Sequence, residues 1–351
     1  MTTFHHALRR RFVFRSLAAW LAAGSMATAA MPVALAQEGS GAAAASRTPT
    51  GKVPAAVSVL SIVEHPSLDA LRDGLHDELK DAGYQDGKSL HWAYQSAQGN
   101  QGTAVQIARK FVGDRPDVIV PIATPAAQAV VSATHQIPVV YNAITDPIAA
   151  QIVKSMAPSG TNVTGVSDKL VADRQVAFIK RVVPDVKRVG IIYSPAEANS
   201  VSATREMKVA LEKQGISLVE VAAPRSIDVG QAAQRLVGKV DVIYTSNDNN
   251  VISAYESVIK VANAAKIPLI CADRSSVQRG ATGAMAIDYY RMGRQTGRMV
   301  LRILNGEKPG DIASETSDRL DITLNLDAAR RQGATLSPEL QAEASEIFGK
   351  P

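Results

Sequence analysis

The chain has 351 residues, of which 46% are hydrophobic and 20% are charged, and its formal net charge is +5. Residues 1–36 contain four arginines and no acidic residue, so removing them lowers the net charge to +1. A nearly neutral chain without a basic stripe or a DNA-reading motif is not expected to bind nucleic acid. The roughly 300 residues from Val53 onward suggest two domains rather than one.

The N-terminal segment has the pattern of a secretory signal peptide. A basic stretch that includes Arg9–Arg11 precedes an apolar run, residues 17–31, and Ala34-Leu35-Ala36 follows it. This order predicts cleavage after Ala36 and export to the periplasm, by the Sec or the twin-arginine route. An uncleaved membrane anchor is the alternative, but the apolar run is short for a span. Residues 37–52 are small and polar, which predicts a disordered linker.

The single cysteine, Cys271, lies in the apolar run IPLICAD. No intramolecular disulfide is therefore available, and no cysteine follows the leader as a site for a lipid anchor. We expect the mature protein to be soluble and to depend on its core alone.

Strand-like and helical patterns alternate along the rest of the chain. Between most strands lie helical stripes, such as Leu68, Leu71 and Leu75 within residues 67–83. This alternation predicts an α/β fold with parallel sheets, about four units before Asn162 and four after Lys187, and hence two doubly wound lobes. The predicted strands are 56–60, 89–95, 117–123, 137–144, 162–167, 188–194, 217–223, 241–246, 267–273 and 282–288.

In sheets of this kind a ligand binds outside the carboxyl ends of the strands. Polar residues follow most of the predicted strands, and we take them as candidates for the site. The polar candidates are His65, Thr124, Thr145, Asp146, Ser194, Asn247, Asp248 and Asp273, to which we add Ala126 in the turn after the third strand.

The turn after the third strand, Thr124-Pro125-Ala126-Ala127, is unusually small. Pro125 suits the first position of a helix, and we expect Thr124 to be its N-cap. The free N–H groups and the positive end of the helix dipole offer a site for a small anion. Bulky side chains on this turn would block the site. Simple capping by Thr124 is the alternative, and the local sequence does not decide between them.

The polar groups at the other strand ends complement such an anion site. Hydroxyls and helix-terminal N–H groups suit a carboxylate, and acidic side chains suit an ammonium group, so the set as a whole suits a zwitterion. The acidic members are Asp146, Asp248 and Asp273. Each of them, and Asn249 before the predicted helix 251–265, is also a good helix cap, and Asp168 has the same local alternative.

Motifs of enzymatic chemistry are missing from the sequence. It contains no G-x-S-x-G, H-E-x-x-H, G-x-G-x-x-G or P-loop pattern, and the histidines after the leader are scattered. We therefore predict no catalytic residues, no bound metal and no cofactor. An exported α/β enzyme stays an alternative to a binding protein.

Several stretches resemble one family, the periplasmic substrate-binding proteins of ABC transporters with the type I fold, in their tryptophan- or aromatic-amino-acid-binding-like branch. They cover most of the chain from Val53 to Gly333, in the same order. The stretches are SIVEHPSLDALRDGL (61–75), SAQGNQGTAVQIARKFV (96–112), IATPAAQAVVSATHQIPVVYNAITDP (122–147), GTNVTGVSD (160–168) and IPLICADRSSVQRGATGAMAIDYYRMGRQTG (267–297).

The resemblance implies two Rossmann-like lobes with a ligand cleft between them, joined by crossovers near Thr164, Ala284 and Asp311. It divides the chain into residues 53–163 with 285–310 and residues 164–284 with 311–351. In more distant amino-acid receptors, the ligand carboxylate is held at places that match Thr124 and Ala143–Thr145. In those receptors, residues of the second lobe hold the ligand ammonium group, and Asp248 is the nearest match to them in this sequence.

The function implied is that of a monomeric receptor for a small ligand, with an amino acid, aromatic or branched, as the best match. By analogy it would close on the ligand and deliver it to a membrane permease driven by an ATPase. A periplasmic sensor that acts on a receptor kinase uses the same fold and stays open as an alternative. A DNA-binding regulator is excluded as an alternative, because the N-terminus of such a regulator would not be an export signal.

Overall fold

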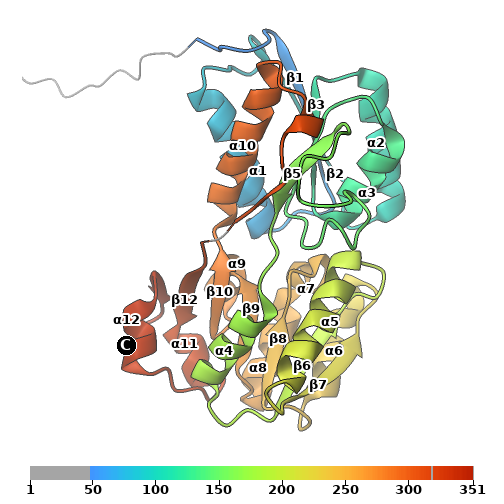
Figure 1. Ribbon diagram of the computed structural model, residues 1–351. Coiled ribbons are helices and arrows are strands. Elements are labelled where there is room, and N and C mark those ends of the chain that lie inside the picture. The colour runs from blue at the N-terminus through green and yellow to red at the C-terminus, as the bar shows by residue number, and fades with distance from the viewer. Residues whose placement is uncertain (1–47, 318, 351) are drawn as a thin grey trace, which may run out of the picture. The chain divides into compact units, whose positions relative to one another are not determined.

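Two separate β-sheets form the framework of the chain (Figure 1). The computed structural model describes residues 48–317 and 319–350. The predicted signal peptide, with its cleavage site, and most of the predicted linker lie outside the described residues.

The first sheet has six strands, all parallel, in the order β11-β5-β4-β3-β1-β2. Its central strand β3 reads VIVPI and is buried throughout, as expected of a strand with helices on both faces. The strands are β1 (Ala55–Ser61), β2 (Leu90–Ser96), β3 (Val118–Ile122), β4 (Val139–Asn142), β5 (Val163–Ser167) and β11 (Glu315–Thr316).

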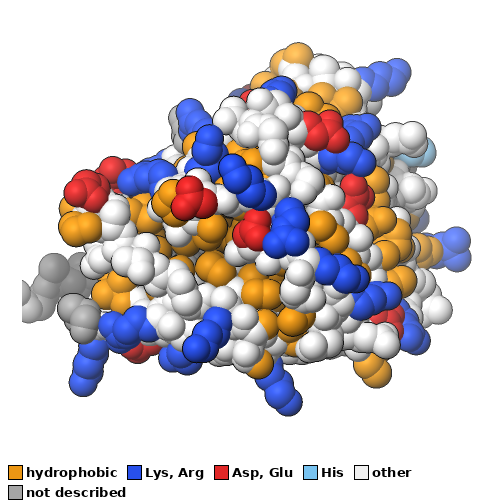
Figure 2. Space-filling view, turned by 90° about the horizontal axis from the view of Figure 1, so that it is seen from below, with side chains coloured by type: hydrophobic (Ala, Val, Ile, Leu, Met, Phe, Trp, Pro, Cys, Tyr) orange, Lys and Arg blue, Asp and Glu red, His pale blue; other side chains and the backbone are white. Residues whose placement is uncertain are grey.

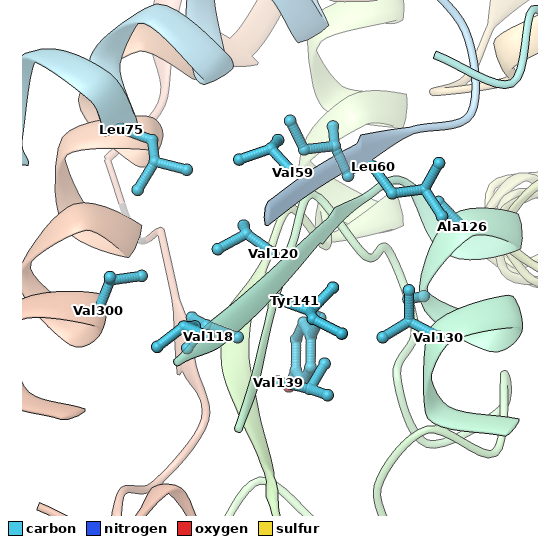
Figure 3. Packing of buried hydrophobic residues seen from close by; sticks show 14 of the residues in the cluster. Val59, Leu60, Leu75, Val118, Val120, Ala126, Val130, Val139, Tyr141 and Val300 are labelled. Atoms are coloured by element: carbon cyan, nitrogen blue, oxygen red, sulfur yellow. The ribbon is translucent and has the colours of Figure 1, made fainter. Parts of the chain in front are cut away.

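Helices cover both faces of this sheet (Figure 1). They are α1 (Pro66–Asp81), α2 (Gln101–Asp114), α3 (Thr124–Ala133), α10 (Tyr289–Leu304) and the short η2 (Pro309–Asp311). Helices α1 and α10 pack together on one face, and α2 and α3 on the other. In Figure 3, Leu75 and Val300 lie on the α1 and α10 side of the strands, and Ala126 and Val130 lie on the α3 side. The core of this lobe therefore lies on both faces of the sheet, between the strands and the helices that cover them.

The second sheet has seven strands in the order β13-β12-β10-β9-β8-β6-β7. Neighbouring strands in this sheet run parallel, except that β10 and β12 pair antiparallel. The strands are β6 (Arg188–Tyr193), β7 (Ser217–Ala222), β8 (Val242–Thr245), β9 (Leu269–Asp273), β10 (Gly283–Ile287), β12 (Asp321–Asn325) and β13 (Glu346–Phe348).

Two apolar clusters lie on opposite faces of this second sheet. The first packs α4 and α5 on the sheet and the second packs α6 and α8. The helices are α4 (Ala172–Val182), α5 (Ala198–Glu212), η1 (Ser226–Asp228), α6 (Val229–Leu236), α7 (Asn249–Ser253), α8 (Tyr255–Ala265), α9 (Arg274–Arg279), α11 (Leu326–Arg331) and α12 (Pro338–Glu343).

This architecture confirms the predicted α/β fold with two lobes and mostly parallel sheets. The chain passes from one sheet to the other after Ser167, after Ile287 and after Thr316. The crossovers were expected near Thr164, Ala284 and Asp311, which lie three to five residues earlier. The expected division at 163/164 would cut β5, all of which belongs to the first sheet.

One predicted helix differs from the structure. The expected helix 251–265 is two helices, α7 and α8, which meet at Ala254. The cap is Asp248 and not Asn249, because the Asp248 side chain accepts a hydrogen bond from the Val251 amide.

On the surface drawn in Figure 2, lysine and arginine side chains are spread over the face rather than gathered in one stripe. No helix among the described residues is long and apolar enough to cross a bilayer.

Candidate ligand-binding site

A small cavity, here called the central cavity, lies where loops at the carboxyl ends of strands from both sheets meet. Its volume of about 10 Å³ leaves room for about one water molecule. The lining residues are His65, Leu68, Ala123, Thr124, Ala143, Thr145, Asp168, Asn199, Asn247, Asn249, Ile252 and Tyr289.

The start of α3 forms one end of the central cavity. Thr124 is not the N-cap, as the sequence suggested; the N-cap is Ala123, which makes no side-chain cap. The Thr124 hydroxyl is buried and has no hydrogen-bond partner. Because it does not cap its own helix, it is free to bind a ligand, together with the unpaired amides of the first helical turn.

The backbone is strained on both sides of this helix start. Ala123 has φ of 72° and Ala143 has φ of 55°, a region that residues with a side chain rarely adopt. Both alanines line the central cavity at the ends of neighbouring strands, β3 and β4. Strain of this kind concentrates at ligand-binding sites.

A buried carboxylate, Asp168, forms another part of the cavity wall. It follows β5, is 2% exposed, and accepts hydrogen bonds from Thr145 Oγ1 at 2.9 Å, Asn247 Nδ2 at 3.0 Å and Tyr289 Oη at 2.6 Å. All three donors are neutral, and no ion pair to Asp168 is present within the described part of the chain. Burial raises the pKa of this carboxyl, and the bonds from Tyr289 and Thr145 oppose the shift.

Two asparagines add unpaired acceptors to the same cavity. The Oδ1 atoms of Asn199 and Asn247 are buried without partners. Asn199 Nδ2 donates to the Asn247 carbonyl at 2.8 Å and to Glu197 Oε2 at 3.2 Å, so its Oδ1 is turned away from Glu197. Asn249 Nδ2 also donates to Glu197, at 2.6 Å. Buried polar atoms in folded proteins are normally paired, which makes these oxygens candidates for ligand contacts.

His65 contributes an uncharged side chain to the cavity wall. It is the N-cap of α1, with Nδ1 3.5 Å from the Leu68 amide. Burial lowers the pKa of this histidine to about 4, against the opposing effect of Asp273. At neutral pH the imidazole is therefore neutral and adds no charge to the site.

A family model described as ABC transporter substrate binding protein matches residues 56–348. The chain belongs to this family.

Three related proteins carry the comparison further. The chain is 38% identical to the Tyrosine-binding protein of Clostridioides difficile (strain R20291), over 84% of this chain and 85% of the relative. It is 47% identical to a conserved domain protein from Vibrio cholerae, with a TM-score of 0.83, over 84% and 99% of the two chains. It is 34% identical to an ABC domain from Streptococcus pneumonia in complex with L-Trp, with a TM-score of 0.81 and the same coverage. The predicted family and its tryptophan- and tyrosine-related branch are thereby confirmed, and the family is one of binding proteins rather than enzymes.

Five of the ten site residues predicted for this substrate-binding protein line the central cavity: His65, Thr124, Ala143, Thr145 and Asn247. Their role in binding stays a prediction. Ala126 lies behind them, with its side chain in the core of the first lobe.

Asp248 and Ser194 do not line the central cavity. Asp248 is fully buried and accepts hydrogen bonds from the Ser194 amide at 2.6 Å, the Ser194 hydroxyl at 2.8 Å, Ser200 Oγ at 2.5 Å and the Val251 amide at 3.0 Å. The carboxylate thus joins the loop after β6 to the start of α7. The geometry does not support its expected role as the partner of a ligand ammonium.

Asp146 and Asp273 also lie outside the lining of the central cavity. Asp146 accepts hydrogen bonds from the Ala149 amide at 2.9 Å and from Ser202 Oγ at 3.0 Å. Asp273 caps α9 through the Ser276 amide at 2.9 Å and accepts a bond from Ser67 Oγ at 2.9 Å. Asp273 has the helix-capping role that its sequence position allowed, whereas Asp146 holds a turn, because no helix follows it.

Sequence analysis missed seven residues of the cavity lining, with Glu197 behind Asn199. The polar ones are Asp168, Asn199, Asn249 and Tyr289, and the apolar ones are Leu68, Ala123 and Ile252. Asp168 directly follows β5, so its position at a strand end could have identified it. Tyr289 begins α10 after the second crossover, and its place beside Asp168 depends on the tertiary fold. Among the described residues, no group of three or more His, Cys, Asp or Glu is placed to hold a metal.

Proposed function

We propose that this substrate-binding protein is the extracytoplasmic receptor of an ABC importer and that its ligand is an α-amino acid with an aromatic side chain. The observation that carries the proposal is the buried carboxylate of Asp168, which has only neutral partners and faces the cavity that Thr124 also lines. A buried charge is costly unless an opposite charge pairs with it. A ligand ammonium group would supply that charge.

An ammonium group has three N–H donors, and the central cavity offers enough acceptors for them. Besides Asp168, the unpaired Oδ1 atoms of Asn199 and Asn247 line the same space. The carboxylate of the ligand would bind at the other end, to the Thr124 hydroxyl and the free amides at the start of α3. The arrangement suits a zwitterion, as expected, with Asp168 in the place assigned to Asp248.

The names of the relatives support the choice of an aromatic amino acid. One relative is a tyrosine-binding protein, and another has been crystallised in complex with L-Trp. In transport, the lobes would close around the ligand by hinge motion, and the closed form would dock on an inner-membrane permease. The cleaved signal peptide and the monomeric state belong to the same proposal.

A thermal melt against a ligand panel tests this function. The mature protein, residues 37–351, is unfolded and refolded to remove carried ligand, then heated with amino acids, sugars, purines or organic acids. A ligand at 100 times its Kd adds about 2.7 kcal/mol of stability, which raises the melting temperature by roughly 5 °C. We expect this shift with aromatic amino acids. A shift with sugars or organic acids alone would contradict the zwitterion site.

A further inference from the structure

A second cavity, here called the side cavity, adjoins the central one. It lies between α4, α5 and the carboxyl ends of β8 and β9. Its volume is about 30 Å³, so a larger group enters only if side chains of its wall move. Thr145 and Asn247 line both cavities. The same two side chains donate hydrogen bonds to Asp168. The wall shared by the two cavities therefore also holds Asp168, the proposed partner of the ligand ammonium group.

The surface of the side cavity suits a flat apolar group. Leu170, Met207 and the ring of Tyr244 provide apolar surface, and alanines such as Ala203 and Ala272 leave room beside them. The one acidic side chain in the lining, Glu206, is paired with Lys169 at 2.7 Å. The side cavity therefore carries no unpaired charge and favours a neutral group.

Besides Asn247 Oδ1 in the shared wall, two polar atoms of this lining have no partner. Gln175 is 1% exposed, and its Nε2 donates to the Met285 carbonyl at 2.9 Å, which fixes the amide and leaves Oε1 without a hydrogen bond. Ser246 is 4% exposed, and its Oγ is also unpaired. Buried acceptors of this kind are rare in folded proteins and mark a place where a donor is missing.

We propose that the side cavity holds the side chain of the ligand and that Gln175 and Ser246 select an aromatic ring that carries a hydrogen-bond donor, a phenol or an indole, over a plain phenyl ring. The inference rests on the proposed function, because Asp168 must first hold the ammonium group beside the shared wall. The side chain then passes Thr145 and Asn247, and the ring lies against Tyr244 with its O–H or N–H directed at Gln175 Oε1. A phenyl ring in the same place would leave both polar atoms unpaired.

Titration calorimetry on the refolded, ligand-free mature protein tests the preference. We expect L-tyrosine or L-tryptophan to bind about 10- to 100-fold more tightly than L-phenylalanine, because a site built for a donor discriminates against an analogue without one. Equal affinity for all three, or tighter binding of L-phenylalanine, would overturn the proposal.

Substitutions in the side cavity locate the origin of the preference. Gln175→Met keeps the size of the side chain but removes the acceptor, and we expect it to bring the affinities for the three ligands to within about threefold of each other. Ser246→Ala, which breaks no hydrogen bond in the structure, is the second variant in case Gln175→Met does not fold. The matched control is Thr204→Val on α5, whose hydroxyl is likewise buried and unpaired but lies outside both cavity linings.

The outcomes separate this inference from the proposed function. If aromatic amino acids bind but neither Gln175→Met nor Ser246→Ala changes the preference more than Thr204→Val does, the side cavity is not the side-chain subsite and the receptor function stands. If no amino acid binds the wild-type protein, the zwitterion site fails and this inference fails with it.

Discussion

Asp168 and Asp248 are both buried carboxylates at strand ends, but their partners give them different roles. Asp248 is saturated by two backbone amides and two hydroxyls of its own lobe. Asp168 is held by three side chains that line the central cavity, which leaves a charge for a ligand to pair. The hydrogen-bond partners, and not the residue type, therefore decide which aspartate is available for binding.

Replacing Asp248 should affect folding rather than binding. Asp248→Ala removes the cap of α7 and leaves the Ser200 hydroxyl without its acceptor, and it removes the Asp248 bonds to the Ser194 amide and hydroxyl. We expect the free energy of unfolding to fall by at least about 2 kcal/mol, with ligand affinity within threefold of wild type. Urea unfolding and calorimetry measure the two quantities. A large loss of affinity in a stable variant would return Asp248 to the binding site.

Glu197 should make the stability of the protein depend on pH. Burial, together with the nearby Asp248 charge, raises the pKa of Glu197 to about 7 from an ordinary value of 4.5. A folded-state pKa above the unfolded value means that the Glu197 contribution is most favourable below pH 4.5 and is lost as pH rises to about 7. Compared with Glu197→Gln, the wild type should lose about 3 kcal/mol across this range.

Urea unfolding of the ligand-free wild type and Glu197→Gln between pH 4.5 and 8 measures this difference. The comparison with the variant cancels the opposite effect of His65, whose lowered pKa makes the fold less stable as pH falls from 6.5 towards 4. A difference between the two proteins that stays constant with pH would contradict the burial of an ionisable Glu197.

Among the elements, the pair α1 and α10 shows why α10 belongs to the first lobe although it follows the second. A Cβ on Gly293 would lie 2.0 Å from the Leu71 carbonyl oxygen, and one on Gly74 would lie 2.1 Å from that of Tyr290. The two helices therefore approach with backbone against backbone at these glycines. This contact joins segments more than 200 residues apart in the sequence.

Gly293→Ala tests the close contact of α1 and α10. The added methyl must push the helices apart, and we expect the free energy of unfolding to fall by about 2 kcal/mol or more. Gly113→Ala in α2 is the matched control, because nothing lies within 4 Å of its added Cβ. The control should be neutral or more stable by up to about 1 kcal/mol. Equal effects of the two changes would show that the helices are not in close contact.

The elements of the fold were largely predictable from the sequence, and the exceptions have physical reasons. The ten predicted strands all exist. Continuous apolar runs indicated those buried on both faces, such as β3 and β9, whereas the edge strands β2 and β7 are only partly buried. Strands β11, β12 and β13 were missed. In β12, Ile322 and Leu324 alternate with polar residues, the pattern of an antiparallel strand, and β12 does pair antiparallel with β10. Strands β11 and β13, at two and three residues, are too short to show a pattern.

At the scale of the whole molecule, the central cavity collects residues from loops that the three crossovers bring together. Position after a strand selected Thr124, Thr145 and Asn247 from the sequence. Sequence position did not distinguish a strand end that faces the cavity, such as that of Asp168, from one that faces its own lobe, such as that of Asp248. That distinction depends on how loops of the two sheets meet, which local pattern does not encode.

Calorimetric titration of ligand-free wild type and Asp168→Asn with L-tyrosine and L-tryptophan tests whether the Asp168 carboxylate binds the ligand ammonium. The variant keeps the size of the side chain and an oxygen for its neighbours, and it should fold with a melting temperature no lower than wild type, because a buried charge without an ionic partner has been removed. We expect the wild type to bind at least one of these amino acids and Asp168→Asn to bind it at least about 100-fold more weakly. Unchanged affinity in the folded variant would contradict this role of Asp168.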